Sequence, residues 1–495
     1  MNQRLSAPGP SLWPATSRPE AAHLRTRRVR SRTFKRRLCS ATAVVASAEP
    51  VPTSCDTHTS QLMSWLEAQG APEQAVKIGH ARPPGEDGYS VTVASRKVEA
   101  GETIMRIPER LVITLDRIFK DEAMGELLTT GKLSELACLT LYLMYEKKRG
   151  RASPWVPLIK ELDRTRGRGQ QGARTPLLWA PGQAERLLAG SPVLKELKLR
   201  LQGIEKEYHE LDTVWFMAGS LFNQYPYDIP TEAFGMGLFL QAFAAVQASI
   251  VHLQGVAPGK RFALIPLGPP LLSYSPLSKA MLRYNAETHE VQLAADQAYS
   301  ECAPVRVWCG PQPNGRLLIN YGIVDEDNPY DRLSLTVTLP LADPLYSLKR
   351  SLLMPHGLST QQTFQMQRGQ ALPDNLLQYV RFAHTDSEAS ARAAASGFSS
   401  PSPSPVEPAL EHVAILHLVT YLQQRLDRYP TTIEQDTAVL EDPMSNPRER
   451  VAARLVRIEK RILQGALKQV MALPGAGAMP ENVAPVQQVI AVRLS

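Results

Sequence analysis

The chain has 495 residues, of which 43% are hydrophobic and 21% charged, so it is long enough to bury a sizeable core and to form two or three domains. Its formal net charge is +7, but residues 1–50 hold ten Lys and Arg against two acidic residues, which leaves the rest of the chain close to neutral. A neutral body lacks the basic surface on which nucleic-acid binding depends, so we predict no nucleic-acid partner.

Residues 1–50 are rich in Arg, Ser and Ala and contain the stretch RTRRVRSRTFKRRLCSATAVVAS. This segment has no apolar core long enough for a secretory signal, and its composition is typical of an organelle transit peptide. The passage RRLCSATA suits plastid processing between Leu38 and Glu49. We therefore predict a plastid transit peptide over residues 1–50 and a location in the chloroplast stroma; a disordered basic tail is the alternative.

The first elements beyond this segment are predicted to be one helix and three strands. SQLMSWLEAQG indicates an amphipathic helix that begins at Gln61 and stops at Gly70. The alternation in YSVTVASRKVEAGETIMRIPERLVIT predicts a pair of strands around the turn EAGE, followed by a third strand. These strands span Val91–Ala94, Ile104–Ile107 and Leu111–Thr114.

From about residue 120 to 255 the apolar residues have helical spacing, as in ELACLTLYLMYEKKRG and LKELKLRLQGIEKEYHEL. Phe234–Leu253 carries no formal charge over twenty residues, which makes it a candidate membrane span. It contains Gln241, Gln247 and His252 and has no adjacent Lys or Arg cluster, which favours a buried helix. We predict no membrane partner.

Strand patterns return between Phe262 and Pro340, so the order is strands, a long helical insertion, and strands again. This region contains LLINYGIVDEDNPYD, in which Leu317–Ile319 read as a short buried strand or a helix end and Asn328-Pro329 marks an acidic turn. Tyr321 lies between the two. It is either a core residue with a satisfied hydroxyl or a catalytic hydroxyl, and Gly322 behind it would allow a close approach.

Beyond Pro340 the composition changes. Residues 386–409 are rich in Ser, Ala and Pro, which predicts a flexible loop or linker. The helical pattern LEHVAILHLVTYLQQRLDRY then places Val413, Leu416 and Tyr421 on one face.

A second helix is predicted from NPRERVAARLVRIEKRILQGALKQVMAL, because Asn446 is a good N-cap and Pro447 suits the first helical position. Its core stripe is predicted to consist of Val451, Leu455, Ile458 and Leu463, with Arg and Lys outside. Packing within its own domain is favoured over a free partner-binding helix.

None of the five cysteines forms a C-x-x-C pair, so neither a zinc site nor a disulfide framework is predicted, and we expect no metal. Cys302 and Cys309 are expected to be buried, reduced thiols.

Several passages occur in the order found in one known family. They include SVTVASRKVEAGETIMRIPERLVIT, FALIPLGPPLLSYSP, CGPQPNGRLLINYGIVDEDNPYD and RYPTTIEQDTAVLEDPMSNPRERVAARLVRIEKRIL. Over roughly residues 60–475 the chain resembles SET-domain methyltransferases of the Rubisco large-subunit methyltransferase type. The resemblance implies an α+β fold, with a SET-domain β-fold at 51–340, a helical insertion at about 120–255, and an all-α C-terminal substrate-binding domain at 341–495.

The resemblance also implies the chemistry. Methyl transfer from S-adenosyl-L-methionine is an in-line displacement onto a neutral nitrogen, so the site has to align the partners and favour the deprotonated amine rather than bind a metal. In this family a tyrosine lies at the base of the lysine channel, and Tyr321 stands at that position. We therefore predict Tyr321 as the catalytic residue.

The expected cofactor side departs from the family pattern. Ser273 and Tyr274 stand where the family has Asn-His, and the glycine loop before the first strand reads GEDGYS, with Gly85 and Gly88 two residues apart. These four residues are our predicted cofactor contacts. An Arg common near the end of the charge-free helix is also absent, and Lys260 or Arg261 is a candidate replacement.

Two functions follow from this pattern. The first is an S-adenosyl-L-methionine-dependent protein-lysine N-methyltransferase, monomeric, acting on a non-histone stromal protein such as the Rubisco large subunit or an aldolase-like substrate. The alternative is a catalytically inactive SET-fold scaffold that binds a plastid protein partner. In both, the partner is a protein bound through the C-terminal helical domain.

Overall fold

The computed structural model describes residues 53–54, 61–81, 89–121, 124–129, 133–165, 175–222, 235–399, 408–473 and 493–494. The predicted transit peptide and the glycine loop with Gly85 and Gly88 lie outside these residues.

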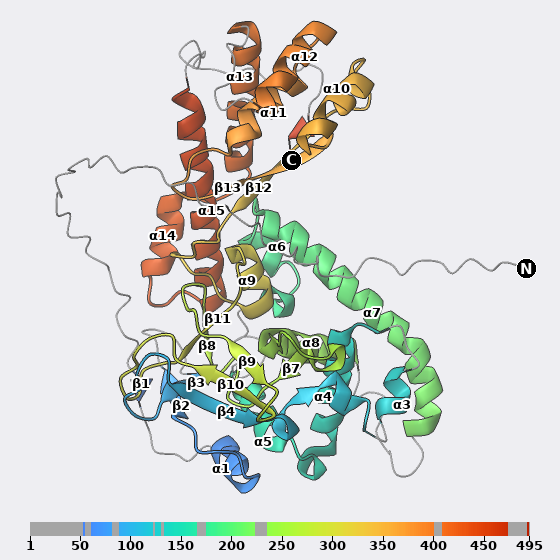
Figure 1. Cartoon of the computed structure of the whole chain (residues 1–495), viewed down its shortest axis with the longest axis vertical. Coiled ribbons are helices and arrows are strands. Elements are labelled where there is room, and N and C mark those ends of the chain that lie inside the picture. Colours follow the sequence, from blue (N-terminus) through green and yellow to red (C-terminus); the bar gives the residue numbers. More distant parts are fainter. Residues whose placement is uncertain are drawn as a thin grey trace, which may run out of the picture. The chain divides into compact units, whose positions relative to one another are not determined.

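The N-terminal part of the described chain is one helix and a set of short strands (Figure 1). The helix predicted from Gln61 is confirmed, and so are the strands around Val91 and Ile104. The elements are β1 (Thr53–Ser54), α1 (Gln61–Ala68), β2 (Val76–Ala81), β3 (Tyr89–Ala94), β4 (Thr103–Pro108) and β5 (Ile113–Thr114).

The expectation that β3 and β4 pair with each other is wrong. β3 pairs antiparallel with β2, which the sequence analysis did not predict, and β4 pairs antiparallel with β10 (Glu290–Ala294). After β3, Val98 forms an isolated antiparallel β-bridge with Tyr299. The chain then enters a second sheet with β4. Alternation reveals a strand but not its neighbour, because the partner is chosen by packing across the whole domain.

Helices fill the middle of the chain, as the spacing predicted. They are α2 (Leu115–Ile118), α3 (Met124–Thr129), α4 (Glu135–Arg149), α5 (Val156–Thr165), α6 (Gln183–Leu187), α7 (Pro192–Phe222) and α8 (Met236–Ser249). The charge-free stretch forms α8, whose side chains are mostly buried against α4 and α7. No helix in the described part of the chain is long and apolar enough to cross a membrane.

The strands that return after α8 complete three small sheets. They are β6 (Ile250–His252), β7 (Phe262–Leu264), β8 (Ser273–Ser275), β9 (Leu282–Asn285), β10 and β11 (Arg306–Trp308). The sheets have the orders β5-β7-β6, β4-β10-β9 and β11-β8. The last of these is parallel and pairs Tyr274 with Val307.

The segment from Leu317 to Ile319 is helical, which decides between the two alternatives left open by the sequence. It belongs to α9 (Asn314–Tyr321), and Tyr321 is the last residue of that helix. Gly322 ends α9 with φ of 69°, and its N–H donates to the carbonyls of Leu317 and Leu318. A left-handed residue at this position is the usual helix ending and favours glycine, so Gly322 serves the helix end.

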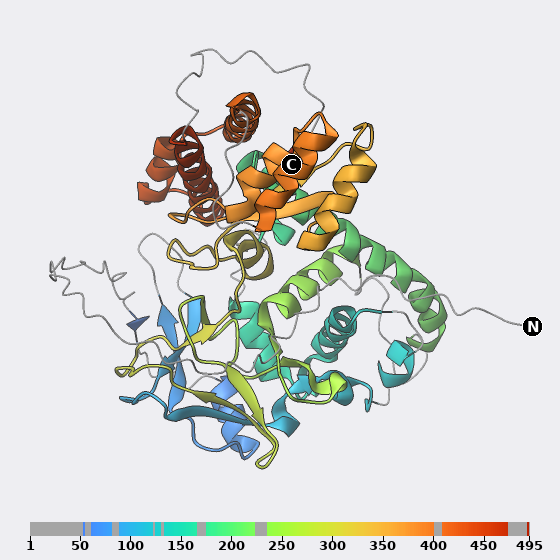
Figure 2. The ribbon, with the colours of Figure 1, turned by 45° about the horizontal axis from the view of Figure 1, so that its top comes forward.

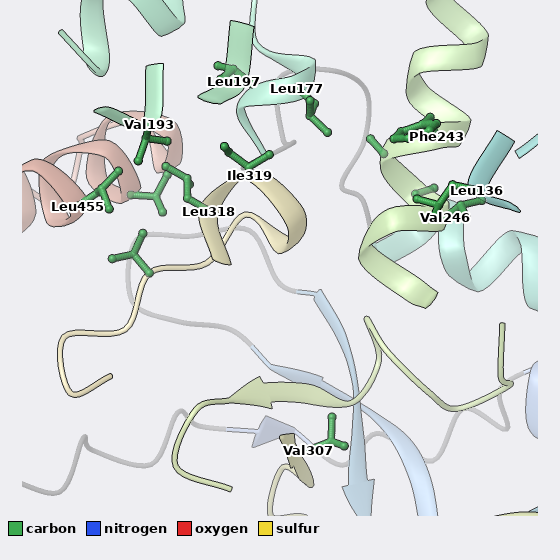
Figure 3. Packing of buried hydrophobic residues seen from close by; sticks show 14 of the residues in the cluster. Leu136, Leu177, Val193, Leu197, Phe243, Val246, Val307, Leu318, Ile319 and Leu455 are labelled. Atoms are coloured by element: carbon green, nitrogen blue, oxygen red, sulfur yellow. The ribbon is translucent and has the colours of Figure 1, made fainter. Parts of the chain in front are cut away.

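Helix α9 contributes to the hydrophobic core. Leu317, Leu318 and Ile319 are fully buried. Figure 3 shows Leu318 on the side of Val193 and Leu455, and Ile319 on the side of Leu177 and Leu197. Helix α9 therefore packs against α7 and α15 (Pro447–Met471), so the position of Tyr321 depends on both halves of the chain.

The C-terminal region contains β12 (Leu333–Thr338), α10 (Tyr346–Leu353), β13 (Gln361–Met366), α11 (Asp374–Ala383), α12 (Glu388–Ser396), α13 (Pro408–Asp427), α14 (Ile433–Glu441), α15 and β14 (Arg493–Leu494). The α+β class is confirmed, but this region is not all-α, because β12 pairs with β13 and β14. The alternation in Gln361–Met366, with Phe364 and Met366 buried, was the overlooked signal.

Residues 386–409 are not the flexible loop that was expected, as far as they are described. Ser387 caps α12, and its hydroxyl accepts the N–H of Ser390 in a reciprocal capping box. Small residues here pack a tight helix, since Ala391, Ala394 and Ala395 are buried. Composition suggested a linker because the same Ser and Ala residues are common in flexible segments.

Helix α15 begins as predicted. The Asn446 side chain accepts the N–H of Arg448, and Pro447 occupies the first turn of the helix. In Figure 2 this red helix runs beside α13 and α14. Its predicted apolar stripe is buried, whereas on α13 Val413 and Leu416 are only partly buried and Ala414, Ile415 and Leu418 are buried instead.

The expectation that Arg and Lys of α15 lie outside is wrong for Arg448, Arg457 and Lys460, which are buried. Each has a polar partner: Arg448 donates to Gln183 at 2.8 Å, Arg457 pairs with Glu326, and Lys460 pairs with Asp436 at 2.6 Å. Buried charge is tolerated where it is paired, and periodicity cannot reveal partners on other elements.

The thiols agree only partly with expectation. Cys138 and Cys309 are buried and free, but Cys302 is disulfide-bonded, so the reduced state predicted for it is wrong. Sequence spacing does not reveal which distant cysteines the fold brings together. Within the described residues no group of three or more His, Cys, Asp or Glu could hold a metal ion.

A histidine pair joins α11 and α13, and we expect it to make stability depend on pH. His384 Nε2 lies 2.7 Å from His417 Nδ1. Burial, with smaller contributions from His417 and Lys349, lowers the pKa of His384 from 6.5 to about 4, and burial also lowers the pKa of His417. As the pH falls from 6.5 toward 4, His384 becomes protonated in the unfolded chain but stays largely neutral in the folded chain. The free energy of unfolding should therefore drop by about 2–3 kcal/mol over this range.

Urea denaturation at pH 8 and pH 4.5 would measure this loss. His384→Gln should remove most of it, whereas the exposed His209→Gln should not. An unchanged pH dependence in His384→Gln would show that other groups cause it.

Candidate functional site

Two tyrosines meet where α9 ends. Tyr274 comes from the middle of β8 and Tyr321 from the last position of α9. Their ring centroids are 4.3 Å apart and the rings are inclined by 39°. The parallel pairing of β8 with β11 places Tyr274 there, so the fold brings together the predicted catalytic residue and one predicted cofactor contact.

The amide of Gln312 reaches the Tyr321 hydroxyl. Gln312 Nε2 lies 3.4 Å from that hydroxyl and also donates to the Cys309 carbonyl at 2.9 Å. Its Oε1 accepts from Asn320 Nδ2 at 3.1 Å, which fixes the orientation of the amide. Gln312 therefore presents an N–H to the phenolic oxygen rather than a carbonyl.

Both tyrosines remain neutral at physiological pH. Burial raises the pKa of Tyr321 above its usual value, although the hydrogen bond from Gln312 opposes that rise. Burial and then the neighbouring Tyr321 raise the pKa of Tyr274 further. The Tyr321 hydroxyl can therefore accept or donate a hydrogen bond, but it is not a phenolate base.

The acidic turn after α9 forms a hydrogen-bond network around Asn314, the first residue of that helix. Asn314 is fully buried, and its Nδ2 donates to the Asp325 carbonyl and to Asp331 Oδ2, both at 2.8 Å. Its Oδ1 accepts the N–H of Asp325 at 3.1 Å and Asn328 Nδ2 at 3.3 Å. The turn is therefore tied to the first residue of α9 through Asp325, Asn328 and Asp331, which explains the Asn and one of the acids in it.

We expect Asn314→Ala to lower the free energy of unfolding by about 2–4 kcal/mol, because several buried polar groups lose their partner. Asp331 would be left in a site where burial already raises its pKa. Asp327→Asn is the matched control, since Asp327 is exposed on the same turn and should change stability by less than about 0.5 kcal/mol. Urea denaturation compares the two. Equal urea midpoints for the two variants would rule out a stabilising role for the hydrogen bonds of Asn314.

The other predicted cofactor contacts are only partly described. Ser273 is half-buried on β8, and its N–H donates to the Val305 carbonyl at 3.1 Å. Ser90, the last residue of GEDGYS, lies on β3 and is buried, and its hydroxyl has no hydrogen-bond partner. The sequence analysis did not select Ser90.

Lys260 and Arg261 do not serve as the replacement cation that was suggested. Lys260 Nζ lies 2.6 Å from Glu109 Oε1, and Arg261 lies 2.5 Å from Glu135 Oε2. Each charge is already paired with a carboxylate, so neither is available to bind a second one.

Comparison with known proteins places this geometry in context. Residues 340–463 match the family described as Rubisco LSMT substrate-binding. Actin-histidine N-methyltransferase of Danio rerio is 24% identical over 427 residues, which cover 82% of this chain and 67% of that protein. SET domain-containing protein 4 of Homo sapiens is 26% identical over 353 residues, covering 68% of this chain and 74% of that protein.

Among solved structures, Rubisco LSMT bound to sinefungin and monomethyllysine superimposes with a TM-score of 0.67, at 19% identity, over 83% of this chain and 91% of that one. The chain has the SET fold of the Rubisco LSMT type. Rubisco LSMT bound to AdoMet gives a TM-score of 0.64 at 18% identity, covering 83% of this chain and 92% of that one.

The residues of this SET-fold chain fit a methyl-donor cofactor in part. Tyr274 offers an aromatic ring, Ser273 lies beside it on β8, and the unpartnered Ser90 hydroxyl has hydrogen-bonding capacity to satisfy. A cation for a carboxylate is the element that the suggested residues do not supply.

Sequence reasoning missed Gln312, Asn314 and Asn320, which orient Tyr321 and its helix. The local signal for Gln312 and Asn314 is the stretch PQPNG, in which Pro313 immediately precedes α9, and Asn320 has no such signal. A Gln or Asn in such a stretch reads as a turn residue, and its role becomes visible only with its partners.

Proposed function

We propose that the chain is an S-adenosyl-L-methionine-dependent protein N-methyltransferase that modifies a lysine of a non-histone plastid stromal protein, such as the Rubisco large subunit or an aldolase-like protein. The observation that carries the proposal is the neutral Tyr321 hydroxyl, oriented by Gln312 at the end of a helix that packs between the two halves of the chain. The match of residues 340–463 to a substrate-binding family supports a protein as acceptor.

In this proposal S-adenosyl-L-methionine supplies an electrophilic methyl group when bound. Ser273, Tyr274, Ser90 and the loop with Gly85 and Gly88 would hold it. Tyr321 would accept a hydrogen bond from the acceptor nitrogen and so orient its lone pair. The acceptor nitrogen has to be neutral at the moment of transfer, because its lone pair attacks the methyl carbon.

Lysine and histidine make different demands on this site. A lysine of pKa about 10.4 must lose a proton before transfer, whereas a histidine of pKa about 6.5 is largely neutral at pH 7.5. Relatives named for actin-histidine methylation make histidine the competing acceptor. Acid hydrolysis of the labelled product followed by amino-acid chromatography distinguishes methyllysine from methylhistidine. Labelled methylhistidine would overturn the lysine assignment.

The alternative, an inactive scaffold, draws support from the tight packing of Tyr274 on Tyr321, because a ring lies against the residue that the acceptor must reach. Calorimetric titration of the purified chain with S-adenosyl-L-methionine and S-adenosyl-L-homocysteine separates the two functions. We expect micromolar binding, followed by methyl transfer to a protein in stromal extract. No binding at millimolar ligand to a folded chain would favour the scaffold, and deletion of residues 340–495 should then abolish partner capture.

The stromal location rests on the composition of residues 1–50. Import into isolated chloroplasts should shorten the chain by about this length, and removal of residues 1–50 should abolish import. Full-length protein left outside the organelle would contradict the proposed location. The proposed monomeric state predicts a solution mass near 54.7 kDa for the full chain.

A further inference from the structure

A cleft lies between the segment from Glu109 to Asp121 and helix α4, among residues that do not contact Tyr321. It has a volume of about 340 Å³ and is lined by residues of α2 and α4, of the chain on either side of α2, and of the chain just before α5. Ligand pockets in proteins start at about 300 Å³, so this cleft is large enough for a small molecule.

Glu146 gives the cleft an unsatisfied buried carboxylate. Only 1% of the residue is exposed. Its Oε1 accepts from Arg149 Nη1 at 2.9 Å, while its Oε2 is buried and has no hydrogen-bond partner. A buried charged oxygen without a partner costs about 1–3 kcal/mol or more. A donor placed in the cleft would recover this energy, and an ammonium group is the donor that suits a carboxylate best.

The wall beside Glu146 is aromatic and fixed. Trp155 Nε1 donates to the Tyr142 hydroxyl at 3.0 Å, and both side chains are buried. The guanidinium of Arg117 lies 5.5 Å from the centroid of the Trp155 ring. Because these groups hold one another, the cleft does not depend on a ligand for its shape.

Cationic groups line the same cleft. Arg117 Nε donates to the Val112 carbonyl at 3.1 Å, which fixes the guanidinium at its base. Lys120 is exposed at the rim, and within the described part of the chain neither Arg117 nor Lys120 forms an ion pair. A carboxylate ligand could therefore bind between them.

The charges exclude ligands of a single sign. A simple anion would face the carboxylates of Glu109, Asp116, Asp121 and Glu146, and a simple cation would face Arg117, Lys120 and Arg149. We propose that this cleft binds a small zwitterion of the α-amino acid class, with the ammonium group donating to Glu146 Oε2 and the carboxylate received by Arg117 and Lys120. This site is separate from the methyl-transfer site and does not rest on the proposed function.

The test is calorimetric titration of the full chain with L-methionine, L-glutamine and L-arginine, which share the zwitterion and differ in side chain. We expect saturable binding of at least one, with a Kd of about 1 mM or tighter for a ligand of about ten non-hydrogen atoms. N-acetylation of that amino acid, or amidation of its carboxylate, should weaken binding at least about tenfold, because each removes one charge.

Glu146→Gln should likewise weaken binding at least about tenfold, since the amide keeps an acceptor for Arg149 but loses the charge. If that variant does not fold, Lys120→Ala tests the carboxylate end at an exposed position, with the nearby exposed Lys148→Ala as the unaffected control. The proposal is overturned if none of the three amino acids binds at 10 mM to the folded chain. It is also overturned if the N-acetyl derivative binds as well as the free amino acid.

Discussion

Replacing Tyr321 with phenylalanine should reduce the rate of methyl transfer at least about 100-fold while the chain stays folded. The substitution removes one oxygen and keeps the ring that packs on Tyr274. Gln312 loses only a long contact of 3.4 Å, and its Nε2 keeps the bond to the Cys309 carbonyl. Stability should therefore change by less than about 1 kcal/mol. A single-turnover assay with labelled S-adenosyl-L-methionine, beside urea denaturation, measures both quantities.

Two variants serve as controls for this prediction. Tyr330→Phe alters a half-buried tyrosine on the acidic turn and should leave transfer unchanged. Gln312→Leu removes the donor to Tyr321 and should reduce the rate, but less than Tyr321→Phe does, because the phenolic oxygen remains. Full activity of Tyr321→Phe would remove this tyrosine from the mechanism. If the unmodified chain itself transfers no methyl group, the failure lies with the proposed activity rather than with Tyr321.

Replacing Lys349 with methionine should lower the free energy of unfolding by about 3–5 kcal/mol. Lys349 is fully buried, and its ammonium group donates to Asp343 Oδ2 at 2.7 Å. It also donates to the carbonyls of Ala383 at 3.0 Å and Thr385 at 2.8 Å. This ammonium ties α10 to the end of α11, so its loss leaves one buried carboxylate and two carbonyls without their donor.

The double variant Lys349→Met with Asp343→Asn isolates the charge. Asparagine can still accept the N–H of Leu345, which Asp343 Oδ1 accepts at 2.8 Å, but it carries no uncompensated charge. We expect it to recover at least about 1 kcal/mol relative to Lys349→Met alone. Arg350→Ala, at the exposed neighbouring position, should cost less than about 0.5 kcal/mol. A cost for Lys349→Met as small as that of Arg350→Ala would contradict this account.

Local signals predicted several elements well. The N-cap Asn446 and Pro447 located the start of α15, and the apolar spacing from about 120 to 255 indicated the helical insertion. Strand pairing was not predicted, since β3 and β4 are adjacent in sequence and belong to different sheets. The helix α12 was missed because its Ser and Ala residues also suit a linker.

The candidate site divides in the same way. The position of Tyr321 could be selected from sequence, because a tyrosine followed by glycine and an acidic turn is a local pattern that the family resemblance made specific. Its surroundings could not, because Tyr274 and Gln312 reach it from β8 and from the loop before α9.

The sequence by itself determined the succession of strands, helical insertion and strands up to Pro340, the start of α15 at its Asn446 cap, and the resemblance from which Tyr321 is predicted as the catalytic residue. Those features depend on contacts within a few residues along the chain, where spacing and side-chain type are sufficient. Only the tertiary structure decided which strands pair, which buried charges such as Lys349 and Glu146 have partners, and that Tyr274 lies against Tyr321. These outcomes depend on burial and on partners distant in sequence, and the free energy of a buried polar group is set by what surrounds it.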